Sequence, residues 1–446
     1  MTCVINWFRR RYWEDADGEV TFPKIDGELD NQPGKGRFER LTNDGFSYHS
    51  VIVSLSNRFL SYIFLCILYP HPVSSVPRLL VFAATKENGK DTLVYSTRLI
   101  GSDTGAKADS NPFLLPSRLI APKVGKDTTY WVPESISVDD KYVALTMYYG
   151  HSYRPLYILD ISGVDPKMPE QVNLPGVTEK AEETLYRSAT FSRDPARAHM
   201  LYVITNAFGN FASVVAYDTL TKTVTHITTP ERPDLHPIRA IPWETGSLLV
   251  TPAALFFLAN VEGWQTMYAM SLSGAGSSVS ARSHVVFEVR MRDWEGSPVA
   301  YTTNVRNGKP NEVVVQFNSF RMNGFLALID FSSVLEVGNA QLERDEQGNL
   351  YFPVTPRAYH QATPSSPQFQ VYPPRLLKFK SFDGLEVPCM YYHPEKGKTA
   401  VPVVINIHGG PASQSTAETR MLVPFSGLTT LLTQLGFCLA LFTATC

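Results

Sequence analysis

A glycine loop near the C-terminus offers the clearest candidate for chemistry in this 446-residue chain. The almost entirely apolar run 401–407 breaks at His408, Gly409 and Gly410, and Pro411 follows. Consecutive glycines allow a turn whose N–H groups point into one cavity, where they can stabilise negative charge that develops on an oxygen. The pattern predicts a buried strand that runs into an oxyanion-side loop. An ordinary strand-to-helix turn is the alternative.

A nucleophile to accompany that loop cannot be assigned. The sequence contains no G-x-S-x-G motif, which would place a serine on a sharp turn between a strand and a helix. The nearest match, Gly150 to Arg154, lacks the second glycine and lies in a predicted β-hairpin. No serine, aspartate or histidine is therefore assigned to a catalytic triad.

The elements around the loop predict the opening of an α/β sheet. Residues 376–382 and 387–393 alternate like half-exposed strands around an Asp383-Gly384 turn, which is a hairpin signal. The run 401–407 has the composition of a central strand that is covered on both faces. A helix over 425–435 and a further buried strand over 436–441 complete the predicted order.

A weak repeat with strand-like sequences precedes this region. Each copy is a short apolar run that follows another strand-like run and a polar hairpin, and three of the four copies carry an aspartate before the next turn. The copies are 156–161, 214–219, 267–272 and 326–331. A period of about 50 residues with about four strands is typical of a β-propeller blade. We therefore predict a mainly β fold, with an N-terminal β-propeller of six to eight blades before the incomplete start of an α/β-hydrolase domain; an irregular β-sandwich is the alternative.

The predicted domains are an N-terminal extension over 1–36, the propeller over 37–370 and the hydrolase segment over 375–446. The apolar run 59–69 and the Pro-rich stretch that follows it to residue 77 interrupt the first predicted blade. Two readings of 59–77 stay open, which are an insertion and an extra buried strand.

Composition narrows the class of protein. The net charge is −2, which gives no electrostatic case for nucleic acid or an anionic membrane as a partner. The five cysteines are scattered without C-x-x-C spacing, against both a disulfide framework and a zinc site. The run 59–69 is well short of the ~20 residues of a membrane-spanning helix, and the N-terminus has no signal-peptide core. We expect a cytoplasmic protein with no metal or organic cofactor.

Residues 375–441 resemble the prolyl oligopeptidase family of serine peptidases. The resemblance rests on SFDGLEVPCMYYHP, VPVVINIHGGPASQS and LGFCLALF, and the HGGP form is closest to the acylaminoacyl-peptidase and dipeptidyl-aminopeptidase-like branches. It implies a propeller before an α/β-hydrolase domain, hydrolysis of short peptides, and an oxyanion-side role for His408, Gly409 and Gly410.

The same resemblance implies two further expectations. The family's nucleophile, aspartate and histidine lie beyond Cys446, so the chain is expected to be truncated within the catalytic domain and inactive as given. Glu182 and Glu183 are similar to the glutamate pair that binds a substrate's ammonium group in dipeptidyl peptidases, although adjacent surface glutamates are common. A non-catalytic propeller that binds peptides or proteins, and an esterase with the same loop, remain alternatives. The oligomeric state is not predicted.

Overall fold

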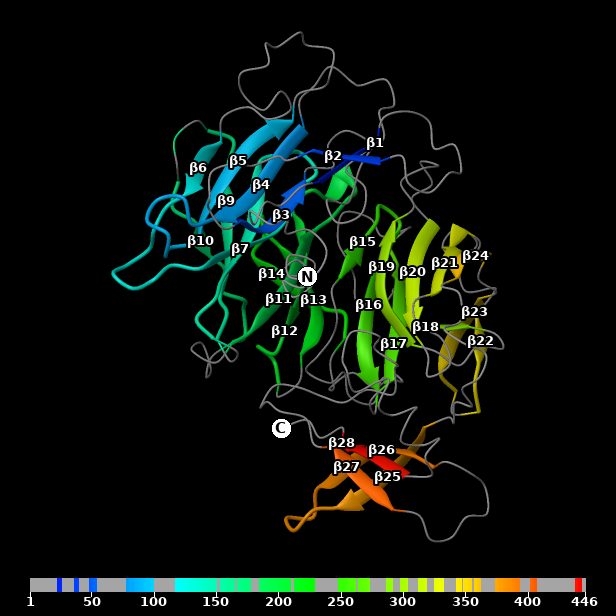
Figure 1. The fold of residues 1–446 in the computed structure, drawn as a ribbon. Helices are drawn as coiled ribbons and strands as arrows, with labels where there is room; N and C mark the ends of the chain where they lie inside the picture. Colours follow the sequence, from blue (N-terminus) through cyan, green and yellow to red (C-terminus); the bar gives the residue numbers. More distant parts are fainter. Residues whose placement is uncertain are drawn as a thin grey trace. The chain divides into compact units, whose positions relative to one another are not determined.

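The computed structural model of the protein is built almost entirely of β-strands (Figure 1). It describes residues 22–25, 36–39, 48–53, 78–99, 117–150, 153–163, 165, 167–177, 184–209, 212–228, 248–261, 264–272, 286–291, 297–303, 312–318, 325–332, 342–346, 348–354, 357–361, 374–393, 402–406 and 438–442. Contacts group the chain into two compact units, which are Met1–Ala207 with Val215–Thr225 and Phe208–Val214 with His226–Cys446. None of the described residues forms a helix with the length and apolarity needed to cross a bilayer.

In the described chain, five sheets follow a two-stranded sheet of β1 (Phe22–Ile25) and β2 (Gly36–Glu39). Four of them have four strands, and the fourth in chain order has six. The first holds β3 (Tyr48–Val53), β4 (Arg78–Ala84), β5 (Leu93–Leu99) and β6 (Arg118–Ala121). The second holds β7 (Trp131–Ile136), β8 (Tyr142–Met147), β9 (Leu156–Asp160) and β10 (Glu170–Gln171). The third holds β11 (Tyr186–Phe191), β12 (Met200–Thr205), β13 (Ser213–Asp218) and β14 (Thr223–His226), with the 3-10 turn Pro195–Arg197 between β11 and β12.

The last two of these sheets lie in the second unit. One holds β15 (Leu249–Val250), β16 (Ala254–Val261), β17 (Trp264–Ser271) and β18 (Val286–Met291). The other holds β19 (Ser297–Thr303), β20 (Glu312–Asn318), β21 (Phe325–Asp330) and β24 (Arg357–Gln361). Between β21 and β24 the chain returns to the preceding sheet. It forms β22 (Glu343–Arg344) and β23 (Leu350–Val354), and β23 pairs with β18 in parallel.

The predicted repeat corresponds to one position in these sheets. Its four copies fall on β9, β13, β17 and β21, which are the third strands of four successive sheets. The mainly β fold is thereby confirmed, and the sheets have the strand order expected of propeller blades. The blade count of six to eight stays a prediction.

The aspartate of the repeat has a local structural role. In three copies it ends the third strand, and its Oδ1 accepts a hydrogen bond from the backbone N–H two residues later. These bonds are Ser162 N to Asp160 at 2.9 Å, Leu220 N to Asp218 at 2.8 Å and Ser332 N to Asp330 at 2.9 Å. Such a side-chain bond stabilises a turn without using a backbone acceptor. The repeat therefore marks where each third strand must turn.

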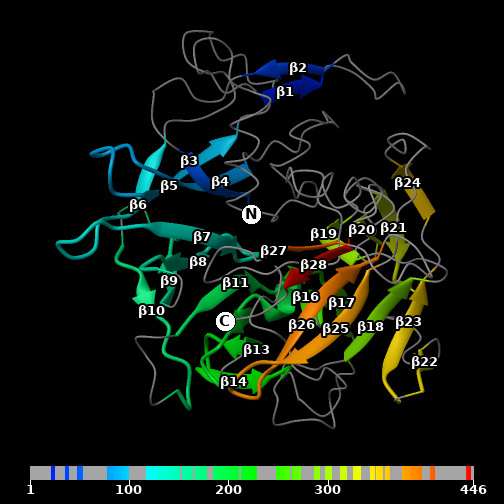
Figure 2. The ribbon, with the colours of Figure 1, turned by 60° about the horizontal axis from the view of Figure 1, so that its bottom comes forward.

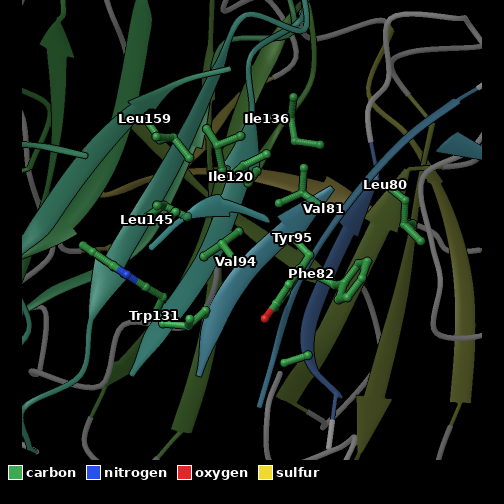
Figure 3. Packing of buried hydrophobic residues seen from close by; sticks show 14 of the residues in the cluster. Leu80, Val81, Phe82, Val94, Tyr95, Ile120, Trp131, Ile136, Leu145 and Leu159 are labelled. Carbon is green, nitrogen blue, oxygen red and sulfur yellow. The ribbon is translucent and has the colours of Figure 1, made fainter. Parts of the chain in front are cut away.

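Consecutive sheets bury their apolar faces together within each unit. In the first unit one cluster joins residues of the first and second sheets, and Figure 3 shows them pointing toward one another. The labelled members are Leu80, Val81, Phe82, Val94, Tyr95 and Ile120 from the first sheet, and Trp131, Ile136, Leu145 and Leu159 from the second. Each such burial contributes about 1.5–3 kcal/mol, so two neighbouring sheets stabilise each other. In the second unit a similar cluster joins the two sheets there, and its members run in sequence from Ala254 to Val354.

The first sheet shows where the predicted insertion falls. β3 and β4 are antiparallel neighbours, and Val53 pairs with Leu80. The interruption at 59–77 lies between these two strands and outside the described residues. The interpretation as an insertion stays a prediction.

A separate four-stranded sheet ends the described chain, with the order β25 (Arg375–Lys380), β26 (Glu386–Tyr392), β28 (Cys438–Phe442) and β27 (Val403–Asn406) (Figure 2). β25 and β26 form the predicted hairpin, and the Gly384 φ of 86° explains why glycine occupies its turn. β28 is antiparallel to β26 and parallel to β27. The strands expected over 376–382, 387–393, 401–407 and 436–441 are confirmed, whereas the predicted helix 425–435 lies outside the described residues.

Candidate functional site

The candidate oxyanion-side loop begins at the end of β27. That strand ends at Asn406, and His408, Gly409 and Gly410 follow outside the described residues. Asn406 is the register partner of Leu441 in the parallel pair of β27 and β28, so the carboxyl ends of both strands meet at one edge of the sheet. In open α/β sheets, ligand-binding loops leave the carboxyl ends of parallel strands. The described part of β27 therefore ends at the edge of the sheet where such a loop is expected.

β27 differs from the strand that the sequence predicted. Its composition indicated a central strand covered on both faces, but among the described strands β27 has β28 as its neighbour and lies at the edge of the sheet. Val403 is 55% exposed and Ile405 is 59% exposed, whereas Val404 packs against Met390 and Tyr392. A run of apolar β-branched residues indicates a preference for burial. It does not indicate which neighbouring element covers the strand.

The glutamate pair Glu182 and Glu183 also lies outside the described residues. The chain that follows it is held by Arg154, because Arg154 N donates to Thr184 O at 3.1 Å and Tyr186 N donates to Arg154 O at 3.0 Å. These bonds connect the segment after the glutamates to the end of the β8–β9 hairpin. The prediction that the two glutamates bind an ammonium group stays a prediction.

The Arg154 side chain forms a charged cluster that sequence reasoning missed. Arg154 Nη2 donates to Glu134 Oε1 at 2.6 Å, and Arg154 Nε donates to Thr146 Oγ1 at 2.8 Å. Thr146 Oγ1 in turn donates to the same Glu134 oxygen at 2.9 Å. The side chains of Arg154 and Glu134 are 21% and 12% exposed, so each largely neutralises the other in a half-buried setting. The three residues come from β7, β8 and the loop before β9, and no local sequence signal joins them.

Four tyrosines lie next in sequence to the elements that carry this charged cluster. Tyr149 and Tyr153 stack with ring centroids 5.3 Å apart, and Tyr130 and Tyr148 meet edge-on at 5.8 Å. Burial is the main cause that raises the pKa of Tyr157, on the adjoining β9, to about 12. Tyr148 and Tyr149 are 40% and 55% exposed. The rings of Tyr148 and Tyr149 are therefore partly open to solvent.

The described residues add no catalytic group to the loop. The short stretch nearest to a nucleophile motif has its serine, Ser152, outside the described residues. Burial raises the pKa of the Cys389 thiol, which disfavours the reactive thiolate. No group of three or more potential metal ligands gathers among the residues the structure describes.

Solved structures of peptidases resemble the chain. No family model and no curated protein matches the sequence. A mutant of puromycin hydrolase complexed with PGG shares 14% identity at a TM-score of 0.57, covering 92% of this chain and 53% of its own. A puromycin-hydrolyzing peptidase of Mycobacterium tuberculosis shares 12% at 0.52, covering 82% and 48%. A post-proline cleaving enzyme from Rickettsia typhi shares 10% at 0.50, covering 88% and 48%.

The chain has the fold of prolyl oligopeptidase family peptidases. The resemblance that the sequence motifs indicated is thereby confirmed at the level of the fold. The chain spans about half the length of each of these solved structures. Their activities belong to the whole proteins, and this chain shares their architecture across most of its own length.

Proposed function

We propose that this chain belongs to a cytoplasmic serine peptidase of the prolyl oligopeptidase type that hydrolyses short peptides. Residues 37–370 would form the propeller that limits access to short substrates, and 375–446 the opening of the α/β-hydrolase domain. The observation that supports the proposal is the parallel pairing of β27 with β28, because β27 ends at the carboxyl edge of the sheet, two residues before His408, Gly409 and Gly410 in the sequence.

In this proposal the backbone N–H groups of the glycine loop stabilise the oxyanion of a tetrahedral intermediate. Attack on the peptide carbonyl also needs a nucleophilic serine with a histidine base and an orienting aspartate. The 446 residues contain no G-x-S-x-G motif to supply that serine. We therefore expect the polypeptide as given to bind peptides without hydrolysing them.

Two experiments test this proposal. The 446-residue polypeptide is incubated with a serine-directed fluorophosphonate and with short peptide and ester substrates, and we expect neither labelling nor turnover. Labelling or turnover by the purified chain would overturn the proposal that it is inactive. Sequencing the transcript beyond the codon for Leu441 tests whether the chain belongs to a serine peptidase. If it does, we expect a continuation that encodes G-x-S-x-G followed by an aspartate and a histidine. A continuation without these residues would favour a binding module.

A second candidate function is a non-catalytic propeller that binds peptides. It is favoured by the partly exposed tyrosines beside the neutralised pair of Arg154 and Glu134, because Tyr and Arg are enriched in protein interfaces. If Glu182 and Glu183 bind an ammonium group, a short peptide with a free N-terminus binds more tightly than its acetylated form. The variant carrying Glu182→Gln and Glu183→Gln should lose this preference in calorimetric titration. Equal binding of both peptides by the unsubstituted chain would remove the proposed role of the glutamates.

A further inference from the structure

The side chain of Asn88 holds the turn between β4 and β5. Its Oδ1 accepts hydrogen bonds from Lys90 N at 2.9 Å and Asp91 N at 2.8 Å, and its Nδ2 donates to Asp91 Oδ2 at 2.6 Å. Asparagine suits this place because one side chain both accepts and donates. Gly89 follows with a φ of 71°, a left-handed conformation that favours glycine. The turn therefore requires asparagine and glycine in succession.

An Asn-Gly pair can react with itself in water. The glycine nitrogen loses its proton and attacks the asparagine Cγ, and no side chain on the glycine hinders the approach. The new bond from Gly89 N to Asn88 Cγ closes a succinimide ring, while the bond from Cγ to Nδ2 breaks and ammonia leaves. Water then opens the ring at one of its two bonds to Gly89 N. Breaking the bond to Cγ gives aspartate, and breaking the bond to the backbone carbonyl carbon gives isoaspartate. Both residues are exposed, so water reaches them.

The native bonds of the turn oppose this attack. Gly89 N donates to Thr85 O at 2.9 Å, so its proton is held in a hydrogen bond. The Asn88 carboxamide is fixed by its bonds to Lys90 and Asp91, which restrict the rotation that would bring Cγ to Gly89 N. Both restraints are lost together when the turn opens. Local opening needs less free energy in an exposed turn than in a buried strand, so the reaction should proceed through the opened turn.

The product cannot keep the contacts that Asn88 makes. Asp91 is 2% exposed, and its contact with Asn88 needs the N–H of an amide. An aspartate at position 88 places a second carboxylate against the first, and the two like charges repel. Lys123 Nζ, which lies 2.9 Å from Asp91 Oδ2, then has two carboxylates to neutralise. Asp91 Oδ1 also accepts Thr129 N at 2.7 Å, so the disturbance reaches the β6–β7 loop.

We propose that Asn88 is a site of spontaneous deamidation, and that its conversion releases the β4–β5 turn from the β6–β7 loop. A second asparagine provides a matched comparison within the chain. Asn349 Nδ2 donates to Asp345 Oδ2 at 3.1 Å in a similar contact, but the next residue is Leu350, whose side chain hinders the attack. Asn349 should therefore stay unmodified. The inference does not depend on peptidase activity.

Peptide mapping by mass spectrometry tests the site without any substitution. The full chain is incubated in mildly alkaline buffer, either folded or unfolded in guanidinium chloride. A synthetic peptide of residues 85–92 in both buffers corrects for the effect of guanidinium on the chemistry. We expect conversion at position 88 in both samples, at least about fivefold slower in the folded one, and far less at position 349 in either. Equal rates at position 88 would overturn the restraint by the turn. A folded chain that stays unmodified there after the unfolded chain has fully converted would overturn the site.

Substitutions test the consequence of the reaction. Asn88→Asp should lower the thermal midpoint of the full chain by about 2–4 °C and speed hydrogen exchange in the peptide that contains Thr129. Lys90→Gln is the matched control, because it makes the same change in net charge at an exposed position of the turn, and it should leave both unchanged. Combining Asn88→Asp with Asp91→Asn restores one carboxylate beside one amide, so the loss should be smaller than the sum of the two single losses. Wild-type exchange in Asn88→Asp would overturn the proposed release, and additive losses would overturn the repulsion.

Discussion

At the scale of single residues, Asp218 explains why an aspartate recurs along the chain. It ends β13, and its Oδ1 accepts hydrogen bonds from Leu220 N at 2.8 Å and Thr221 N at 3.1 Å. The same role falls to Asp160 and Asp330 in their own sheets. A short carboxylate side chain at this position holds the turn that starts the fourth strand.

Two substitutions of Asp218 distinguish its contribution as a hydrogen-bond acceptor in the turn from the contribution of its charge. Asp218→Ala removes the acceptor for two backbone N–H groups and should lower the free energy of unfolding by about 1 kcal/mol. Asp218→Asn keeps an oxygen acceptor in the same place and should cost clearly less. Denaturant titration of both variants measures the difference. If asparagine proves as costly as alanine, the contribution of Asp218 is the charge and not the turn.

The hydrogen bonds of Asp91 lead to a prediction of how the stability of the protein depends on pH. It is 2% exposed, and its carboxylate accepts Thr129 N at 2.7 Å, Asn88 Nδ2 at 2.6 Å and Lys123 Nζ at 2.9 Å. These bonds, with that from Thr129 first, lower the pKa of Asp91 from its ordinary 3.8 to about 2. Because the folded pKa lies below the unfolded one, the stabilisation is complete above about pH 4 and is lost as the pH falls towards 2.

The expected result is a thermal midpoint that falls between pH 4 and pH 2 more steeply in the wild type than in Asp91→Asn. At pH 7 the variant should have a lower thermal midpoint than the wild type. The difference between the two midpoints should shrink as the pH falls and the wild-type carboxylate takes up a proton. Asp127→Asn is the control and should follow the wild type, because Asp127 is exposed and lies in the β6–β7 loop that carries Lys123 and Thr129. Parallel curves for Asp91→Asn and the wild type would rule out this origin of the acid sensitivity.

At the scale of elements, the sequence predicted those strands that pair with the strand next to them in the chain. The repeat at 156–161 and 214–219 corresponds to β9 and β13, and the Asp383-Gly384 turn joins β25 to β26. Both signals are local, since alternation and turn residues act within a few positions.

Long-range pairing could not be predicted in the same way. β23 joins β18 in parallel across more than fifty residues, and nothing in either sequence specifies the other. The ion pair of Glu134 with Arg154 could not be predicted for the same reason, because its two residues come from separate elements. At the candidate site the sequence predicted the strand before the glycine loop but not its place at the edge of the described sheet, because composition does not specify neighbours.

The β3–β4 hairpin leads to a prediction about the interruption at 59–77. Val53 and Leu80 pair in register, so removing 59–77 leaves a loop of residues 54–58 and 78–79 between them, which is long enough to close a hairpin. We expect the deletion variant to keep the circular dichroism spectrum of the full chain and its cooperative melt. The apolar run would then be dispensable, as an insertion is. Loss of the folded signal would instead favour the reading of 59–69 as a buried strand.

At the scale of the whole molecule, the apolar faces of the C-terminal sheet depend on other parts of the chain. Met390 is fully buried, Tyr392 is 6% exposed, and the partly buried Trp264 of β17 packs against their cluster. Without such cover each of the two would lose about 1.5–3 kcal/mol of burial. On the other face Val403 and Ile405 are already exposed in the full chain. A sheet with two uncovered faces lacks a core of its own.

Residues 375–446 expressed alone should therefore be unstable and prone to aggregate. The hairpin tip adds to this tendency, because Phe382 is fully exposed and Leu385 is 61% exposed even within the full chain. Gel filtration and a thermal melt of the fragment, with the full chain at equal concentration as the control, measure the outcome. We expect aggregates without a cooperative transition for the fragment, and a cooperative transition for the full chain. A soluble fragment that is monomeric and melts cooperatively would show that the C-terminal sheet is a folding unit in its own right.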